Sequence, residues 1–175
     1  VGTQMIAKGL DFPLVTLVGV INADSSLNVP DFRSAENTFQ LLSQVSGRAG
    51  RSDLPGEVII QTYNPDHYSI RYAKSHDYIS FYQEEMNNRK ILGYTPYFYI
   101  TLVNITSKDY EKGFAEANKI GDYLRKKLND NSRVLGPTMA NVFKINNVYH
   151  YQCIIKYKRD DKLKKVLRDI DDIYK

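Results

Sequence analysis

The stretch Gln40–Tyr63, QLLSQVSGRAGRSDLPGEVIIQTY, contains a helix pattern, a glycine-rich turn and a strand pattern in direct succession. Apolar residues recur at helical spacing in its first part, which predicts a helix over residues 36–45 that ends at Gly47 or Gly50. Its last part, Glu57–Tyr63, is rich in β-branched residues and follows a Pro-Gly turn, as a strand does. The stretch therefore predicts a helix that returns the chain to a sheet.

An apolar run upstream, LVTLVGV at residues 14–20, predicts the strand that precedes this helix. Its nearly continuous apolar composition is typical of a strand buried on both faces. Strand, helix and strand in this order predict a crossover connection and a mainly parallel sheet. The polar segment 22–34 predicts a loop, and two further helical patterns cover residues 67–74 and 77–91.

A second set of elements follows a proline-marked turn. An alternating strand is expected over 98–105, an amphipathic helix over 108–128 and a short extended piece at 133–137. A hairpin around residues 146–147 leads into a long strand, and a closing helix starts near Asp160. The order β-α-β-β-α is one strand short of a ferredoxin-like sandwich.

Charge divides the chain in a similar place. Residues 1–95 hold eight Lys and Arg against ten Asp and Glu, whereas residues 96–175 hold sixteen against ten. A basic second half favours an anionic partner such as nucleic acid, although a solvated basic surface without a partner accounts for the charge as well. We therefore expect two domains, 1–95 and 96–175.

Composition excludes several classes of protein. With 42% hydrophobic and 25% charged residues the chain is typical of a globular protein, and its apolar runs are too short to cross a bilayer. A single cysteine, Cys153, predicts neither an internal disulfide nor a cysteine zinc site, which favours a reducing, cytoplasmic setting and a buried core position. The three histidines lack metal-ligand spacing, so no metal site is expected here. Because the chain starts at Val1, we expect a piece of a longer protein that begins within a domain.

Two arginines, Arg48 and Arg51, each follow a glycine in the sequence GRAGR. A guanidinium can clamp phosphate oxygens with two hydrogen bonds, and glycines allow the backbone to approach a polyphosphate closely. Such a pair fits an arginine finger, which neutralises charge on a transferring γ-phosphoryl group. By itself GRAGR also fits an ordinary basic turn.

Longer blocks carry a family resemblance. VGTQMIAKGLDFP at the start resembles motif V of superfamily-two helicases, and QVSGRAGR resembles their motif VI. ADSSLNVPDFRSAENTFQLLSQVSGRAGR, GEVIIQTYNPDH and DYISFYQEEMNNRK with YTPYF are similar to the C-terminal part of the primosomal protein N′ family, the bacterial replication-restart DNA helicases. The resemblance runs through essentially the whole chain and is most specific up to about residue 99.

This resemblance implies an α/β fold, with part of a RecA-like helicase lobe followed by a small α+β, ferredoxin-like domain. It implies that the chain is part of an ATP-dependent 3′-to-5′ DNA helicase, which recognises stalled or branched forks and restarts replication by primosome assembly. The implied partners are branched and single-stranded DNA, the single-stranded-DNA-binding protein and other primosome proteins, with no membrane. The implied location is the bacterial cytoplasm, at replication forks of the nucleoid.

The resemblance also implies roles for single residues. Arg48 and Arg51 would contact the γ-phosphate as the catalytic pair. The nucleotide-binding residues would be Gly9, Asp11, Gln44 and Gly47. Thr3 and Lys8 would face the DNA backbone. In the second half, the basic cluster at the last strand and closing helix suggests DNA contacts by Lys156, Lys158 and Lys164. Tyr149, Tyr151 and Tyr157 share one strand face, which fits either base stacking or core packing.

The departures from the family pattern matter too. The sequence contains no GxxxxGK[ST] loop and no matching acidic motif to hold magnesium. We therefore expect ATP and Mg²⁺ only in the full-length enzyme, zinc only on its cysteines outside this chain, and no ATPase activity from this chain alone. The alternative is a non-catalytic nucleic-acid-binding or adaptor module. The sequence shows no nucleophile–base pair and no paired carboxylates that would support a metabolic enzyme.

Overall fold

The computed structural model describes residues 15–47 and 55–174. Chain contacts divide it into two units, Val1–Asn88 and Arg89–Lys175, and the division falls within helix α5 (Tyr78–Leu92). The sequence pattern places the boundary a few residues later, at 95/96. Each unit is described separately below.

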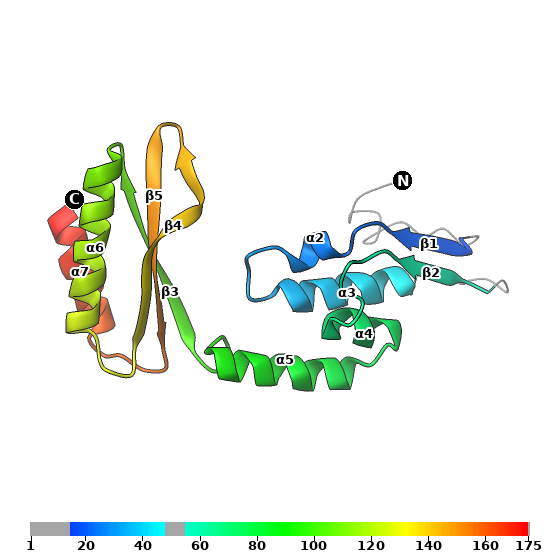
Figure 1. Cartoon of the computed structure of the whole chain (residues 1–175). Helices are drawn as coiled ribbons and strands as arrows, with labels where there is room; N and C mark the ends of the chain where they lie inside the picture. Colours follow the sequence, from blue (N-terminus) through cyan, green and yellow to red (C-terminus); the bar gives the residue numbers. More distant parts are fainter. Residues whose placement is uncertain (1–14, 48–54, 175) are drawn as a thin grey trace. The chain divides into compact units, whose positions relative to one another are not determined.

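The first unit contains two parallel strands with a helix between them (Figure 1). Its elements before α5 are β1 (Leu17–Val20), α2 (Asp24–Leu27), α3 (Ser34–Ser46), β2 (Glu57–Ile60) and α4 (Tyr68–Lys74). Val18 lies opposite Val58 in the pairing of β1 with β2. The predicted parallel strand–helix–strand unit is therefore confirmed, and the predicted loop contains the short helix α2.

Helices cover one face of this two-stranded sheet. Val20 and Ile60 pack against a core that α3, α4 and α5 supply, formed by Phe39, Leu42, Ile70, Ala73 and Phe81. On the other face, Leu17 and Ile59 are 57% and 53% exposed. The prediction that β1 is buried on both faces is therefore wrong for the described residues, because no described element covers that second face.

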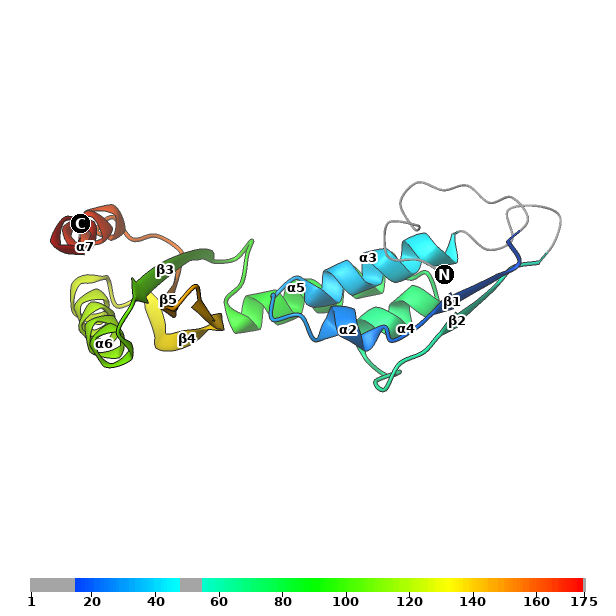
Figure 2. The same cartoon turned by 90° about the horizontal axis from the view of Figure 1, so that it is seen from above.

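The second unit is a three-stranded antiparallel sheet with two helices. Its elements are β3 (Tyr99–Ser107), α6 (Tyr110–Lys127), β4 (Arg133–Ile145), β5 (Val148–Tyr157) and α7 (Leu163–Tyr174). The strand order is β3-β5-β4, and both helices lie on the same side of the sheet (Figures 1 and 2). The predicted β-α-β-β-α order is confirmed.

The hairpin between β4 and β5 turns where the sequence predicts. Ile145 pairs with Val148, and the two residues between them, Asn146 and Asn147, have φ angles of 50° and 62°. Asparagine tolerates this left-handed conformation, which a tight two-residue hairpin turn requires. Strand β4 is longer than the predicted extended piece because its pairing with β5 resumes after Pro137, which has no N–H for the ladder.

The core of the second unit lies between the sheet and its two helices. Cys153 and Ile155 on the central strand β5 have no exposed surface. They pack against residues of both helices and of the α6 C-cap, namely Ile120, Leu124, Leu128, Leu163, Val166 and Ile170. The predicted core position of Cys153 is confirmed.

Among the residues described in the two units, no helix is long and apolar enough to cross a bilayer.

Candidate functional site

The sequence predicts site residues in both units, and the structure describes five of them. Gln44 and Gly47 lie at the end of α3, whereas Lys156, Lys158 and Lys164 lie in the second unit. The other predictions fall outside the described residues: Thr3, Lys8, Gly9, Asp11, Arg48 and Arg51.

Helix α3 positions Gln44 on its last turn. Buried Phe39 and Leu42 fix one face of the helix, and the Gln44 side chain is exposed on another. The helix ends at Gly47, whose N–H donates to the Ser43 carbonyl at 3.3 Å. Of the two predicted stops, Gly47 and Gly50, the helix stops at Gly47.

Gln44 lines a cavity of about 310 Å³ between α2 and α3. Its polar lining residues are Ser25, Ser26, Asn37, Gln40 and Gln44. As far as described residues line it, the cavity has hydroxyl and amide groups and no charged side chain. Such groups can hydrogen-bond a sugar or a base, but the charge needed for a polyphosphate must come from other residues.

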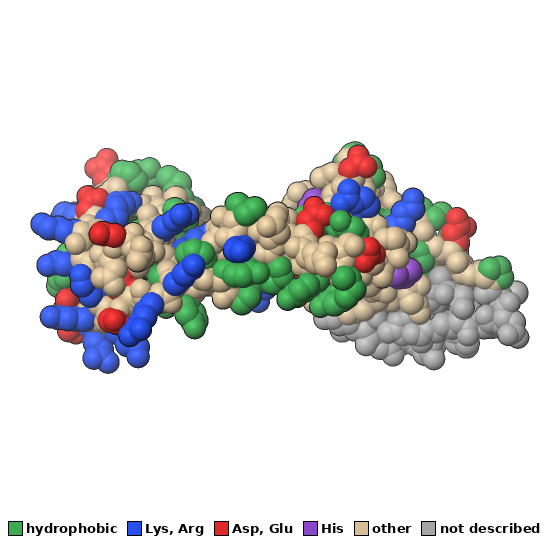
Figure 3. All heavy atoms as spheres, turned by 90° about the horizontal axis from the view of Figure 1, so that it is seen from below, with side chains coloured by type: hydrophobic (Ala, Val, Ile, Leu, Met, Phe, Trp, Pro, Cys, Tyr) green, Lys and Arg blue, Asp and Glu red, His purple; other side chains and the backbone are tan. Residues whose placement is uncertain are grey.

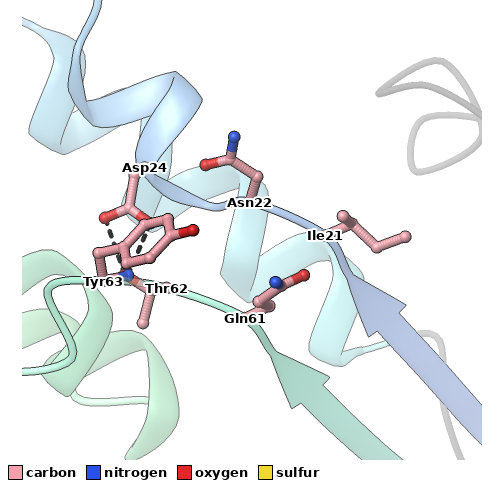
Figure 4. Close-up of a pocket in the computed structure, with 6 residues that line it drawn as sticks. All are labelled: Ile21, Asn22, Asp24, Gln61, Thr62 and Tyr63. Atoms are coloured by element: carbon pink, nitrogen blue, oxygen red, sulfur yellow. Dashed lines mark hydrogen bonds between the residues drawn. The ribbon is translucent and has the colours of Figure 1, made fainter.

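A second cavity, of about 350 Å³, lies where β1 and β2 end (Figure 4). Its floor is organised by Asp24, which is only 9% exposed. The Thr62 hydroxyl donates to Oδ1 of Asp24 at 2.9 Å, and the Tyr63 N–H donates to Oδ2 at 2.9 Å. The Tyr63 N–H lowers the pKa of Asp24 against the opposing effect of burial, so this carboxylate stays ionised. Sequence patterns did not single out Asp24 or Tyr63.

In the second unit, α6 and α7 run antiparallel. Tyr123 on α6 donates to Asp169 on α7 at 3.3 Å, and Tyr174 of α7 donates to Glu116 of α6 at 2.6 Å. As residue numbers rise along α6 they fall along α7. The last turn of α6 therefore lies beside the start of α7.

A turn with the partly buried Asp160 ties these two helix ends together. Its Oδ2 accepts from the Asn129 N–H at 2.9 Å and from the Ser132 hydroxyl at 2.6 Å, while Oδ1 accepts from the Lys162 N–H at 3.0 Å. Burial raises the pKa of Asp160, but these hydrogen bonds outweigh it and hold the pKa below its usual value. An ionised carboxylate thus links the segment after α6 to the segment before α7.

The joined helix ends carry a cluster of exposed basic side chains, which we name the basic end. Its members are Arg125, Lys126, Lys127, Lys158, Arg159, Lys162, Lys164 and Lys165. Lys and Arg side chains gather over this unit in Figure 3. Lys158 and Lys164, two of the residues predicted to contact DNA, are exposed members of this cluster. The run RKK at 125–127 can be read from the sequence. Its position beside the start of α7, which carries Lys164, follows only from the antiparallel packing of the two helices.

Lys156 does not belong to the basic end. It is 8% exposed, its ammonium donates to the Leu92 carbonyl at 2.9 Å, and it lies 3.6 Å from the ring centroid of Tyr94. Its neighbours Ile155 and Tyr157 point to the helix side of the sheet. The expected DNA contact of Lys156 does not fit this buried position, because its ammonium group is already bound within the unit.

The tyrosine alternatives separate in the same strand. Tyr151 is 1% exposed and its hydroxyl donates to the Tyr110 carbonyl at 2.8 Å, so it is a core residue. Tyr149 and Tyr157 are half-buried and pack on Phe143 and Tyr99, respectively. Base stacking on Tyr151 is therefore wrong.

Across the described ranges, no group of three His, Cys, Asp or Glu side chains could hold a metal ion.

Comparison with known proteins gives consistent matches. Residues 90–174 match the family model of the primosomal protein N C-terminal domain. The chain is 53% identical over 174 residues to the replication restart protein PriA of Bacillus subtilis (strain 168), which covers 99% of the chain and 22% of that protein.

Two further relatives carry the same name. The chain is 40% identical over 169 residues to the protein of Chlamydia muridarum, covering 97% of the chain and 22% of the relative. It is 40% identical over 172 residues to the protein of Thermotoga maritima, covering 96% and 23%. The chain thus spans between a fifth and a quarter of the length of these curated relatives.

Proposed function

The chain belongs to the primosomal protein N family, and from this membership we propose that it serves replication restart as part of an ATP-dependent 3′-to-5′ DNA helicase. Residues 1–95 would form the later part of a RecA-like second lobe, and residues 96–175 a ferredoxin-like domain that grips DNA. The intact enzyme would recognise stalled or branched forks and support primosome assembly there, together with the single-stranded-DNA-binding protein.

The single observation that carries the DNA-binding half of this proposal is the basic end. Eight exposed Lys and Arg side chains come from the last turn of α6, the connection between β5 and α7, and the start of α7. Asp160 fixes their backbones relative to one another through three hydrogen bonds. A preorganised cluster of this kind suits the closely spaced phosphates of DNA, where bound cations replace condensed counterions.

The nucleotide half rests on the end of α3. In the intact enzyme, ATP supplies the free energy that drives strand translocation. Gln44 would hydrogen-bond the nucleotide from the last turn of α3, and Arg48 and Arg51 would reach its γ-phosphate. Gly47 would end the helix so that these arginines can approach. The uncharged cavity beside Gln44 fits a sugar or base and not a polyphosphate.

The loop that cradles the phosphates and the acidic residues that hold magnesium would then belong to other parts of the full-length enzyme, as would the zinc-binding cysteines. The present sequence has no GxxxxGK[ST] loop, so the chain by itself is expected to hydrolyse no ATP, with or without DNA. Colorimetric phosphate release measures this directly. DNA-stimulated hydrolysis by the purified chain would contradict the proposal that the phosphate-binding loop lies elsewhere in the full-length enzyme.

Fluorescence anisotropy with forked and single-stranded DNA across a salt series tests the DNA-binding half. We expect binding at low salt that weakens steeply as salt rises, with a logarithmic slope of about −0.9 for each duplex phosphate contacted. Lys164→Gln with Lys165→Gln removes two charges from the basic end. This pair of changes should weaken binding to all sequences and flatten the slope by about two.

Lys112 provides the matched control, because it is exposed on the first turn of α6, at the end of the helix remote from the basic end. Lys112→Gln should leave affinity and slope close to those of the unchanged chain. Equal losses per charge removed in the two variants would show that only net charge matters. No binding at low salt would support the adaptor alternative, in which the basic end meets an acidic protein.

A further inference from the structure

The cavity at the ends of β1 and β2 has a distinct chemistry. Its lining residues are Ile21, Asn22, Asp24, Gln61, Thr62 and Tyr63. They follow two parallel strands at their carboxyl ends, which is where ligands bind in open α/β sheets. Figure 4 shows these six side chains, with Asn22 and Gln61 lying between Tyr63 and Ile21 in this view.

Tyr63 combines a fixed backbone with an exposed ring. Its N–H is held by Asp24 at 2.9 Å, and the next N–H, of Asn64, donates to the Thr62 hydroxyl at 3.0 Å. Despite these anchors, 91% of Tyr63 is exposed. A large aromatic ring on a rigid support, with two rotatable side-chain bonds, offers a stacking surface at small entropic cost.

Two amide side chains stand beside this ring on equally fixed backbone. The Ala23 N–H donates to the Gln61 carbonyl at 3.0 Å, and the Gln61 N–H donates to the Val20 carbonyl at 2.9 Å. Asn22 has a φ of 57°, which asparagine adopts more readily than most residues. Within residues 15–47 and 55–174, the side-chain amides of Asn22 and Gln61 have no hydrogen-bond partner.

Charge decides the class of ligand. None of the described lining residues is Lys, Arg or His, and the one ionised group, Asp24, repels anions. Its oxygens already accept hydrogen bonds from Thr62 and Tyr63. A phosphate is therefore disfavoured here, whereas an uncharged planar ring with donors and acceptors on its edge matches one aromatic face and two amides.

We propose that this cavity binds a nucleobase, which stacks on Tyr63 while Asn22 and Gln61 hydrogen-bond its edge. Ile21 supplies an apolar wall at the same opening. The proposal rests on the proposed function, because that function brings bases to the first unit from a single DNA strand or from a free nucleotide. The chemistry is the same for both sources, and the test below separates them.

A single tryptophan makes the site observable. The chain contains no tryptophan, so Tyr63→Trp introduces one reporter and keeps the backbone N–H that Asp24 binds. Its emission is followed during titration with an adenine homopolymer strand, an abasic strand of the same length, and adenosine, so that the strand and the free ligand carry the same base. We expect stacking to quench emission with the homopolymer strand and to leave it unchanged with the abasic strand.

Ile79→Trp is the control reporter, since Ile79 is 63% exposed on α5 in the same unit and outside the cavity. Its emission should respond to none of the three ligands. In the chain without tryptophan, Tyr63→Ala should weaken strand binding about tenfold, whereas Tyr63→Phe should retain it. Asn22→Gly, which keeps the left-handed backbone, and Gln61→Ala should each weaken it by a smaller factor.

The outcomes separate cleanly. Quenching by the homopolymer strand but not by adenosine identifies a DNA strand as the source, and the reverse identifies a free nucleotide. Equal quenching by the abasic strand would overturn base stacking, as would no quenching by strand or adenosine. Adenosine carries no phosphate, so its titration stands even if the basic end fails to bind DNA.

Discussion

The N–H of Asn129 lies 2.9 Å from Oδ2 of Asp160, a residue 31 positions later in the chain. This hydrogen bond connects the segment that leaves α6 with the segment that enters α7. The same oxygen accepts from Ser132, and the other accepts from Lys162. One carboxylate therefore fixes how the two basic helix ends meet.

Asp160→Ala should lower the free energy of unfolding of the second unit by about 1–3 kcal/mol, because three donors lose a charged acceptor. The pKa of Asp160 lies below its usual value, since hydrogen bonds outweigh burial. The stabilisation is then complete above the unfolded carboxyl pKa of about 4 and is lost as pH falls below it. Urea unfolding at neutral and acidic pH measures both effects.

Asp161 gives the matched control for this change. It pairs with Arg159 at 3.4 Å, and both side chains are at least 80% exposed. Exposed pairs of this kind contribute little, so Asp161→Ala should leave stability nearly unchanged at every pH. Similar losses in both variants would mean that general charge, and not the Asp160 hydrogen bonds, stabilises the unit.

Lys156→Met should destabilise the second unit by about 1–3 kcal/mol, because it removes a charged hydrogen bond to Leu92 and a contact with the Tyr94 ring while keeping most of the side-chain volume. DNA affinity of the folded chain should stay the same. Thermal unfolding and fluorescence anisotropy together test this. A loss of DNA affinity without a loss of stability would show that Lys156 contacts DNA, as the sequence predicts.

His67→Asn should remove a sensitivity of the first unit to mild acid. Burial lowers the pKa of His67 against the pull of Glu84, Glu85 and Asp24, and its Nδ1 caps α4 by accepting from the Ser69 N–H. The unfolded histidine protonates near its ordinary pKa of 6.5, so stability falls as pH drops below that value.

Asparagine is a strong N-cap that does not titrate in this range, so the variant should unfold with little pH dependence between about pH 5 and pH 7. Circular dichroism of thermal unfolding across that range makes the measurement. His76, which is exposed, is the control: His76→Asn should leave the acid sensitivity in place. An unchanged slope in His67→Asn would assign the sensitivity to another group.

Gly113→Ala should destabilise the second unit by about 1–3 kcal/mol, although alanine is the better helix former. A Cβ at position 113 would lie 2.7 Å from Ser107 Cβ and 2.7 Å from a Tyr151 ring carbon. Tyr151 is buried and cannot move away. Urea unfolding compares this variant with Ala115→Gly on an exposed face of α6. A stabilised Gly113→Ala variant would show that the helix can shift from the sheet.

The sequence predicts most of the elements because each carries a local signal. The parallel strand pair, the end of α3 at Gly47 and the turn at Asn146 and Asn147 all follow from apolar spacing, glycine and asparagine. The exposed face of β1 could not be predicted, because an apolar run shows that a strand can be buried and not what covers it. The length of β4 depends on its partner β5, which is a property of the sheet.

The site is less visible in the sequence than the fold. Lys156 and Lys158 have the same charge and lie two positions apart, yet Lys158 is exposed beyond the end of β5, whereas the Lys156 ammonium is buried against Leu92 and Tyr94. The cavity beside Tyr63 depends on Asp24, which is almost forty positions away. Contacts between distant residues of this kind leave no periodic trace in a single sequence.

The buried thiol of Cys153 makes opening of the second unit measurable by alkylation. It is the chain's only cysteine, it lies on the central strand, and none of its surface is exposed. Burial also raises the pKa of its thiol, which suppresses the reactive thiolate. An alkylating reagent can react only after α6 and α7 separate from the sheet. The labelling rate would therefore report how often this unit opens. The first unit contains no cysteine and would not contribute to the rate.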